Sequence, residues 1–332
     1  MYGRGTADAL FIVRSALQKR MKRGLSTWII LVDLIKAFDS CSRPLMASIL
    51  RTCGVHENDV RFVSELYETF HIQVTREDIT KAAMSLAGVR QGCNMAATLF
   101  LFFMFAWVCV TEWPDQGISF LTNDAVRPKK TMYDVNCNKF KAQSSNIDGS
   151  PFREIRERCA FMLRQVMFVD DATMLAKDRN RAMQTAIAAD RSCTRLGHKL
   201  HFAPKPDETS KSVFSCVQAR GLPAPDMSPM KIRDGAYMVA SKVEVAGLQV
   251  DACALLGDII AADLDEKHAA SNNVAKATKA FGAWTTVLCD RKIPRAQRAK
   301  AFNVYIVPIL LYATETWALT QAQTNVLRSC YR

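Results

Sequence analysis

The chain has 332 residues, of which 49% are hydrophobic and 23% charged, an ordinary globular composition that is sufficient for a large core. Its 44 Lys and Arg residues outnumber its 32 Asp and Glu residues and give a net charge of +12, which favours a polyanionic partner such as nucleic acid or an anionic membrane surface. The eleven cysteines form no C-x-x-C pair, which argues against a disulfide framework or a structural zinc site and indicates reduced thiols in an intracellular protein.

The N-terminal segment, residues 1–24, has no long apolar run before a small-residue cleavage site. We therefore expect no secretory signal. Leu10, Val13, Leu17 and Met21 recur at helical spacing and predict a surface helix of the fold. Because the segment is basic and amphipathic, a mitochondrial presequence is the alternative.

The next segment, residues 27–33, is a continuous apolar run that ends in Asp33. This pattern predicts a buried central strand that delivers a carboxylate at its end. On its own, Asp33 could equally be a helix cap or a loop acid. We expect one helix over residues 42–53, with Ser42 as its cap, and another over residues 58–70.

Residues 88–93, GVRQGC, form a glycine-bracketed loop, and residues 95–110 are sixteen residues almost without a polar side chain. The glycines could simply permit a turn. Alternatively, the loop backbone and Gln91 could approach a base and sugar closely, because Gly92 has no side chain in the way. The apolar run is shorter than the roughly 20 residues that a membrane span needs, so we expect a buried helix.

Residues 114–158 are rich in Pro, Gly, Ser and Lys and are predicted to be a surface insertion, whose lysines either contact phosphates or are solvated. Beyond it, two short apolar runs flank Asp170 and Asp171. This pattern predicts a β-hairpin whose tight turn consists of the two acids. Such a turn can be merely solvated, or the two carboxylates can share a cation, for which Mg²⁺ is the natural choice.

A helix is expected over residues 180–196, ending at Gly197. His198 and His201 follow, but in a strand they would face opposite sides, so we reject a metal pair. Further along the chain we expect strands over residues 212–217, 242–248 and 253–256, and then helices over residues 265–289, 294–312 and from 321 onward.

The last helices also carry a basic cluster of five residues: Arg291, Lys292, Arg295, Arg298 and Lys300. Such a cluster suits a duplex backbone, although a solvated helix face carries similar charges.

Three of these segments, residues 33–39 (DLIKAFD), 88–93 (GVRQGC) and 168–171 (FVDD), resemble in this order the central palm motifs of the reverse transcriptases of non-LTR (LINE-type) retrotransposons. Other segments resemble the same family: residues 3–10 its fingers, 210–211 its later palm lysine, 255–257 its primer-contacting hairpin and 309–320 its thumb. The resemblance covers nearly the whole chain. By this resemblance the chain is expected to open within the fingers, as a fragment of a retroelement protein or a gene model started at an internal methionine.

The resemblance implies an α+β right-hand polymerase. Residues 1–257 would form partial fingers and a palm with an antiparallel sheet, and residues 258–332 a helical thumb. The implied activity is RNA-directed DNA synthesis, in which two-metal nucleotidyl transfer joins a dNTP to a primer 3′-hydroxyl. The implied partners are an RNA template, a DNA primer, their RNA/DNA duplex and dNTPs, with no membrane and no obligate protein partner. The implied location is intracellular and nuclear.

The resemblance also assigns the site. Asp33 and Asp170 would bridge two Mg²⁺ ions, or Mn²⁺ ions, with Asp171 in support, and Lys211 would protonate or neutralise the departing pyrophosphate. Five residues would contact the nucleotide: Leu34, through its carbonyl as a further metal ligand, Phe38, under the sugar, and Arg90, Gln91 and Gly92. Six would contact primer or template: Leu256, Gly257, Arg291, Lys292, Arg295 and Arg298.

One departure from the family concerns residues 94–97, which read Asn-Met-Ala-Ala where Pro-Leu-Ser-Pro is typical. Packing after the glycine loop is therefore expected to differ. Two alternative functions stay open. One is a decayed or domesticated relative that binds nucleic acid without synthesis. The other is a different two-metal phosphotransfer enzyme, such as a nucleotide cyclase, against which the glycine loop and the basic helical region argue.

Overall fold

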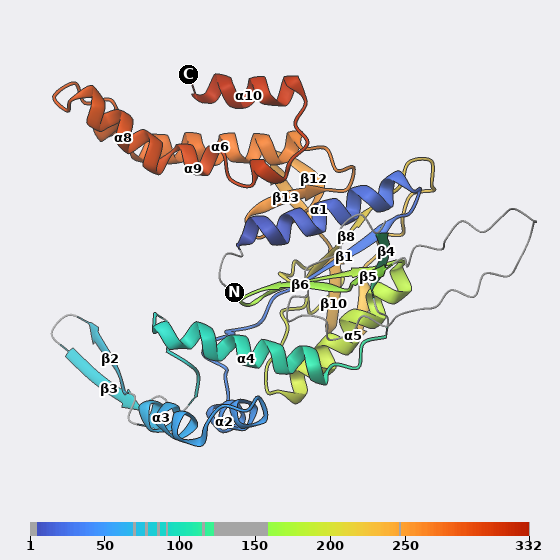
Figure 1. Ribbon diagram of the computed structural model, residues 1–332, viewed down its shortest axis with the longest axis vertical. Helices are drawn as coiled ribbons and strands as arrows, with labels where there is room; N and C mark the ends of the chain where they lie inside the picture. Colours follow the sequence, from blue (N-terminus) through green and yellow to red (C-terminus); the bar gives the residue numbers. More distant parts are fainter. Residues whose placement is uncertain are drawn as a thin grey trace, which may run out of the picture.

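The computed structural model describes residues 5–331 except 69–70, 77–78, 85–86, 91, 115–116, 123–158 and 246. Over these residues it is a mixed α/β fold built around a six-stranded sheet (Figure 1). The strands, in spatial order, are β6 (Gln165–Phe168), β7 (Asp171–Ala176), β1 (Thr27–Val32), β8 (Val213–Val217), β10 (Ala236–Ala240) and β9 (Met230–Arg233). Neighbouring strands are antiparallel except β8 and β10, which are parallel. Helices around a mostly antiparallel sheet agree with the expected α+β class, but the sheet is mixed and not antiparallel throughout.

Strand β1 lies at the centre of this sheet and is covered on both faces. Ile30 and Val32 belong to one hydrophobic core, and Ile29 belongs to another on the opposite face. Because successive side chains point to opposite faces, a strand covered on both sides must be apolar throughout. The prediction of a buried central strand from the apolar run is confirmed.

Helices cover both faces of the sheet (Figure 1). Helix α1 (Thr6–Lys22) packs on one face through Leu10, Val13 and Leu17, as its helical spacing predicts. The opposite face carries α5 (Arg179–Arg195), and α4 (Asn94–Val110) packs beside it. Helix α2 (Arg43–Thr52) packs on α4, α3 (Glu57–Glu68) packs on α2, and both extend the same core. The hydroxyl of Ser42 accepts a hydrogen bond from the Leu45 N–H at 3.4 Å and caps α2 as expected.

Helix α4 contains the long apolar run, and the structure buries only one of its faces. Phe100, Phe103 and Trp107 are almost fully buried, whereas Leu101 and Phe105 are 49% and 59% exposed. The expectation of a buried helix therefore holds for the inner face of α4 and not for its outer face. Across the described part of the chain, no helix combines the length and hydrophobicity needed to cross a membrane.

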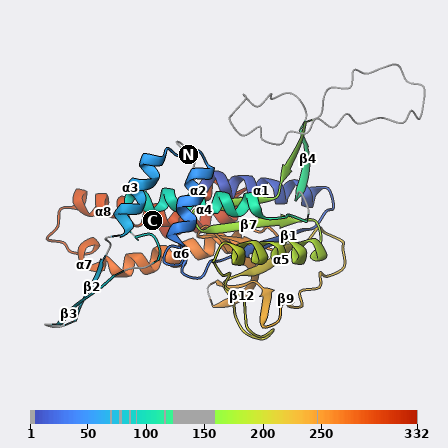
Figure 2. The ribbon, with the colours of Figure 1, turned by 90° about the horizontal axis from the view of Figure 1, so that it is seen from below.

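Two hairpins extend from this body (Figure 2). The sequence did not predict the first, which pairs β2 (His71–Arg76) with β3 (Ile79–Met84). The second pairs β4 (Ile118–Thr122) with β5 (Cys159–Leu163). Most of the predicted surface insertion, residues 123–158, lies outside the described residues.

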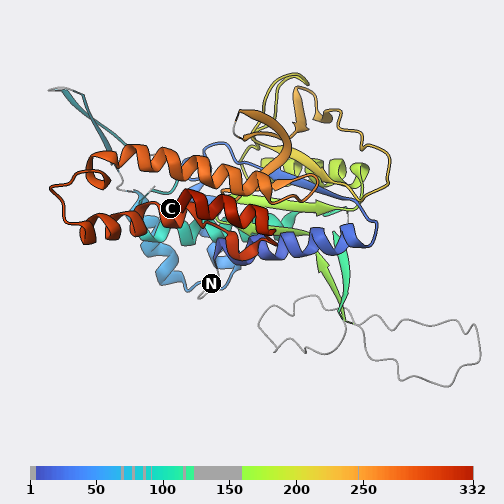
Figure 3. The same ribbon diagram turned by 90° about the horizontal axis from the view of Figure 1, so that it is seen from above.

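The C-terminal part begins with a three-stranded sheet of β11 (Lys242–Val245), β12 (Leu248–Leu255) and β13 (Asp258–Ala261). Helices follow: α6 (Lys267–Ala283), α7 (Thr285–Leu288), α8 (Arg295–Tyr305), α9 (Val307–Leu310), the 3₁₀ turn η1 (Thr314–Thr316) and α10 (Gln321–Tyr331) (Figure 3). They share a core of their own that includes Ala277, Ile306 and Leu327. Strands β9, β10 and β13 were not predicted, and the expected helix over residues 265–289 breaks at Trp284.

His198 is buried in the main core rather than displayed on a strand. It is 1% exposed, and its ring lies 4.0 Å from that of Phe103, measured between centroids. Neither ring nitrogen has a hydrogen-bond partner in the described structure, and burial lowers the pKa of His198 to about 4. The strand expected around it is reduced to one bridge between Leu200 and Leu34.

His198 predicts a loss of stability in acid. The folded protein keeps this imidazole neutral down to a pKa of about 4, whereas the unfolded chain binds a proton below the ordinary value of 6.5. The free energy of unfolding should therefore fall by about 3 kcal/mol between those two pH values because of this residue. We expect His198→Phe to remove that part of the decline, measured by urea denaturation at several pH values. An equally steep decline in the variant would contradict this account of His198.

Candidate active site at the end of strand β1

Asp33 directly follows β1, and its backbone is held on both sides. Its N–H donates to the Ser212 hydroxyl at 3.0 Å, and its carbonyl accepts from the His201 N–H at 2.9 Å. Its side chain is 34% exposed. The buried strand and these two anchors therefore present the carboxylate of Asp33 from a fixed position to solvent.

Asp170 and Asp171 lie at the hairpin between β6 and β7, one position away from the predicted register. Phe168 pairs with Asp171, so the two turn residues are Val169 and Asp170, and Asp171 is the first residue of β7. The prediction that both acids form the turn is wrong for Asp171. Because Val32 pairs with Ala172, the next residues along the two strands, Asp33 and Asp171, face each other at the same end of the sheet.

Val169 makes this turn strained. Its φ is +57°, a region that β-branched residues rarely enter. Two-residue hairpin loops need a positive φ at their first position to match the twist of the strands, and glycine usually supplies it. The valine side chain packs against the main core, which holds it in a conformation that costs of order 1–3 kcal/mol. Such strain is concentrated at functional sites.

The three carboxylates interact electrostatically. The pKa of Asp171 is raised, first because the surrounding chain removes part of its water and then because Asp170 and Asp33 carry like charges. The Nζ atom of Lys211 lies 3.8 Å from an Oδ of Asp33, and the lysine side chain is 70% exposed. Four residues that were assigned to catalysis from the sequence, distant in the chain, thus meet at one edge of the sheet.

These carboxylates have the chemistry of a divalent-metal site. Mg²⁺ prefers carboxylate oxygens, and the like charges that raise the pKa of Asp171 would be relieved by a cation. The described residues contain no group of three His, Cys, Asp or Glu side chains already arranged around a common metal position. The donor set fits the ion, and metal binding would require some of these side chains to reorient.

The glycine loop packs against the segment that follows Asp33. The Gly88 N–H donates to the Cys41 carbonyl at 2.8 Å, and the Val89 N–H donates to the Phe38 carbonyl at 2.9 Å. A Cβ atom on Gly88 would lie 2.7 Å from the Asp39 carbonyl oxygen, whereas one on Gly92 would meet open space. Position 88 therefore requires glycine because a side chain would collide with the Asp39 backbone. Position 92 favours glycine because its φ is +82°.

The remaining nucleotide-pocket residues are placed differently. Arg90 is exposed, and Gln91 lies outside the described residues. Leu34 is buried and pairs with Leu200. The ring of Phe38 is half-buried and stacks on Phe100 at 4.8 Å between centroids. That stacking gives Phe38 a packing role, and its contact with a sugar stays a prediction.

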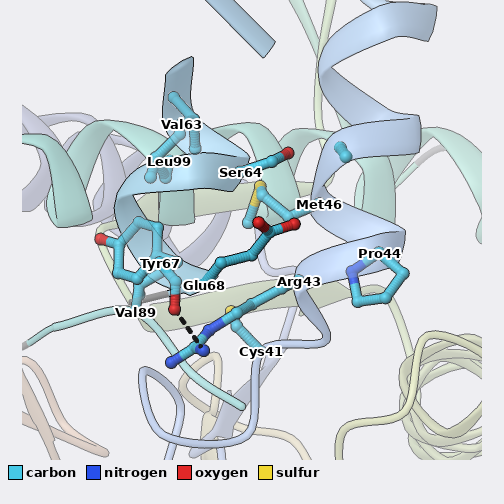
Figure 4. Close-up of a pocket in the computed structure, with 11 residues that line it drawn as sticks. Cys41, Arg43, Pro44, Met46, Val63, Ser64, Tyr67, Glu68, Val89 and Leu99 are labelled. Atoms are coloured by element: carbon cyan, nitrogen blue, oxygen red, sulfur yellow. Dashed lines mark hydrogen bonds between the residues drawn. The ribbon is translucent and has the colours of Figure 1, made fainter. Parts of the chain in front are cut away.

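A pocket of about 570 Å³ lies between α2, α3 and α4, and Val89 of the glycine loop forms part of its lining (Figure 4). Arg43 lines it and donates to the carbonyls of Tyr67 at 2.8 Å, Gly88 at 3.1 Å and Ala87 at 3.2 Å. Arg43 therefore ties the loop to α3. Its position at the start of α2 gave no sequence signal for this role.

The hairpin assigned to the primer is a two-residue turn between β12 and β13. Leu255 pairs with Asp258, and both turn residues have positive φ, +48° at Leu256 and +83° at Gly257, as tight hairpins require. The Tyr312 hydroxyl donates to the Leu256 carbonyl at 2.6 Å, and Lys276 donates to the Gly257 carbonyl at 3.0 Å. The C-terminal helical region thus holds the turn in place.

The basic cluster divides into two kinds of residue. Four members are exposed: Arg291 and Lys292 in the loop between α7 and α8, and Arg295 and Lys300 in α8. Arg298 is only half-exposed and donates to the carbonyls of Ile293 at 3.1 Å and Leu288 at 3.2 Å. Arg298 therefore holds the loop, and the other four present charge to solvent.

No protein-family model matches the chain, and no curated protein matches it. Among solved structures, it is similar to telomerase from Candida albicans in complex with a TWJ fragment of telomeric RNA, with 11% sequence identity and a TM-score of 0.38. The match covers 98% of this chain and 50% of the telomerase chain, so the chain spans about half the length of that protein. At this identity and TM-score the similarity assigns neither a family nor a function.

The two loop glycines form a matched pair for testing how the loop is held. Gly88→Ala and Gly92→Ala both place a side chain at positive φ, which costs about 1–2 kcal/mol. Only Gly88→Ala also forces a Cβ against the Asp39 backbone. We expect it to lower the free energy of unfolding by clearly more than Gly92→Ala, measured by urea denaturation. Equal losses would show that the loop does not pack as described.

Proposed function

We propose that the chain is a reverse transcriptase domain of the non-LTR type, which extends a DNA primer on an RNA template. The observation that carries the proposal is the meeting of Asp33, Asp170, Asp171 and Lys211 at one end of the sheet. The ordered palm-like motifs supply these residues, and the glycine loop packs against the segment that follows Asp33. In this proposal the fold is a right-hand polymerase with partial fingers.

The residues of the chain have separate tasks in this reaction. Two Mg²⁺ or Mn²⁺ ions, when bound, would stabilise the attacking and leaving oxygens of the phosphoryl transfer. Asp33 and Asp170 would hold them, with Asp171 in support. Lys211 lies beside Asp33 on an exposed side chain and would neutralise or protonate the departing pyrophosphate. Phe38, Arg90 and the loop around Gly92 would position the dNTP.

The duplex would lie between the sheet and the C-terminal helices. The turn at Leu256 and Gly257 would contact the primer strand, and the exposed cations of α8 and of the loop before it would contact phosphates. The partners in this proposal are RNA template, DNA primer and dNTPs in a nuclear setting. They are polyanions, which suits a chain with a net charge of +12.

A relative that binds nucleic acid without synthesis is the second candidate. The net charge of +12 suits this candidate equally well, because positive charge favours a polyanionic partner whether or not synthesis occurs. Primer extension by the purified wild-type protein separates the two candidates, because a binding-only relative should retain a template-primer duplex and add no nucleotide.

The first test of the catalytic assignment is replacement of single carboxylates. Asp33→Asn and Asp170→Asn should each lower the rate of primer extension by about 100-fold or more, the scale of losing a group that stabilises transition-state charge. Duplex affinity should change little, because neither residue is assigned to the duplex. Asp234→Asn, at a 97% exposed acid in the turn between β9 and β10 on the opposite edge of the sheet, is the matched control. Undiminished extension by Asp170→Asn would refute the assignment.

The basic cluster makes a separate prediction about salt. Each phosphate contact contributes roughly 0.9 to the slope of log affinity against log salt concentration. Replacing Arg291, Lys292 and Arg295 by Gln should therefore flatten the slope for an RNA/DNA duplex by about 2 to 3. The control replaces three exposed cations of α1 and its C-terminal end, Lys19, Lys22 and Arg23. An unchanged slope in the first variant would show that the cluster is only a solvated surface.

A further inference from the structure

Arg14 of α1 is a buried arginine that sequence reasoning did not single out. Its side chain is 2% exposed. It donates to an Oδ of Asp258 through Nε at 3.1 Å and Nη2 at 2.6 Å, to the Ile259 carbonyl at 2.9 Å, and through Nη1 to the carboxylate of Glu266. One guanidinium therefore binds two carboxylates and a backbone carbonyl at the same time.

The two acids lie in different structural elements. Asp258 opens β13, directly after the turn at Leu256 and Gly257. Glu266 immediately precedes α6, the first C-terminal helix. The Trp317 indole N–H also donates to Asp258, at 3.3 Å. Arg14 thus joins α1, the hairpin turn and the start of the C-terminal helices at one buried point, where these elements lie side by side (Figure 1).

The charges in this cluster do not balance. One arginine meets two carboxylates that are 1% and 5% exposed. One oxygen of each acid, Oδ1 of Asp258 and Oε1 of Glu266, has no hydrogen-bond partner among the described residues. The Cys253 thiol, which interacts electrostatically with Arg14 and Asp258, adds no charge here, because burial raises its pKa to about 12. A second buried negative charge would therefore lack a compensating cation, which is strongly unfavourable in a buried site.

Asp258 and Glu266 differ in how well their surroundings stabilise an ionised carboxylate. Asp258 accepts three hydrogen bonds on one oxygen, two from Arg14 and one from Trp317, whereas Glu266 accepts one. Glu266 also lines a groove between the sheet and the C-terminal helices, from which a proton can exchange with water. The other charged residues of that groove are Arg220, Asp263, Asp265 and Lys267.

We propose that Arg14, Asp258 and Glu266 form a buried positioning unit that fixes the hairpin turn and the start of α6 to α1, and that Glu266 enters it as a neutral, protonated acid. Burial raises the pKa of Glu266, and the like charges of Asp258 and Asp265 raise it further, against the opposing effect of Arg14. The positioning of a primer strand by this unit rests on the proposed function. The protonation of Glu266 does not.

The first experiment compares stability against pH for wild type, Glu266→Gln and Asp258→Asn. A buried acid with a raised pKa holds its proton in the folded state after the unfolded chain has lost it, so its contribution to stability declines as pH rises above the ordinary value of 4.5. Glutamine keeps the shape and carries no charge. Relative to wild type, Glu266→Gln should therefore be no less stable at pH 7, with a difference in Tm that grows from pH 5 upward.

Asp258→Asn should behave in the opposite way and lower Tm throughout, by roughly 2 °C or more. The control is Glu57→Gln, which removes a surface ion pair with Arg51 whose side chains are 61% and 51% exposed and should leave Tm nearly unchanged. A drop in Tm for Glu266→Gln at pH 7 would show that Glu266 is ionised and would overturn the protonation. The same change in Tm with pH for Glu266→Gln and Asp258→Asn would overturn the protonation of Glu266 as well.

The second experiment tests positioning. Arg14→Lys keeps the charge and loses the guanidinium fork, so it cannot reach both carboxylates. We expect an RNA/DNA primer-template to bind Arg14→Lys about tenfold more weakly than wild type by fluorescence anisotropy, and the surface control Glu57→Gln to bind it as wild type does. Unchanged binding by Arg14→Lys with a lowered Tm would make the unit purely structural and overturn this half of the proposal. If wild type itself binds no duplex, the proposed function fails while the pH experiment keeps its meaning.

Discussion

The rest of the structure depends on strand β1, which is buried on both faces and ends where the chain reaches water. Its apolar side chains supply both cores, so a shift in register would disrupt close side-chain packing on both faces. This fixes Asp33, whose backbone is also held by Ser212 and His201. The antiparallel partner β7 brings Asp171 to the same edge. Such a rigid backbone keeps the like-charged carboxylates close together although they repel one another. A site that is to bind a cation needs this kind of support while it is empty.

Much of this arrangement could be predicted from the sequence because local signals and burial agree. The apolar run before Asp33, the spacing of Leu10 and Leu17, and the cap at Ser42 each specify an element that the structure contains. The motif order predicted that Asp33, Asp170 and Lys211 belong together, and pairing between distant strands brings them there. The division of the chain at residue 257 and the roles of the individual site residues remain predictions.

Other features could not be predicted because they depend on contacts between distant residues. The turn acids are displaced by one position because Val169 adopts a positive φ that its sequence does not favour and that core packing holds. Arg14 looks like any cation of an amphipathic helix until the fold places Asp258 and Glu266 around it. Arg298 belongs to a basic cluster by composition, yet it bonds to two backbone carbonyls. The outer face of α4 is exposed, although no residue in the run indicates which side faces the sheet.

The central claim is that the carboxylates at the end of β1 hold a divalent cation, and metal-directed cleavage tests it most directly. Fe²⁺ in place of Mg²⁺, with ascorbate and peroxide, generates hydroxyl radicals at the bound ion and cuts the backbone beside it. The account predicts cuts close to Asp33 and close to the turn at Val169 and Asp170, which excess Mg²⁺ should suppress and Asp33→Asn should weaken. Cuts confined to other segments, or cuts that Mg²⁺ leaves unchanged, would contradict it.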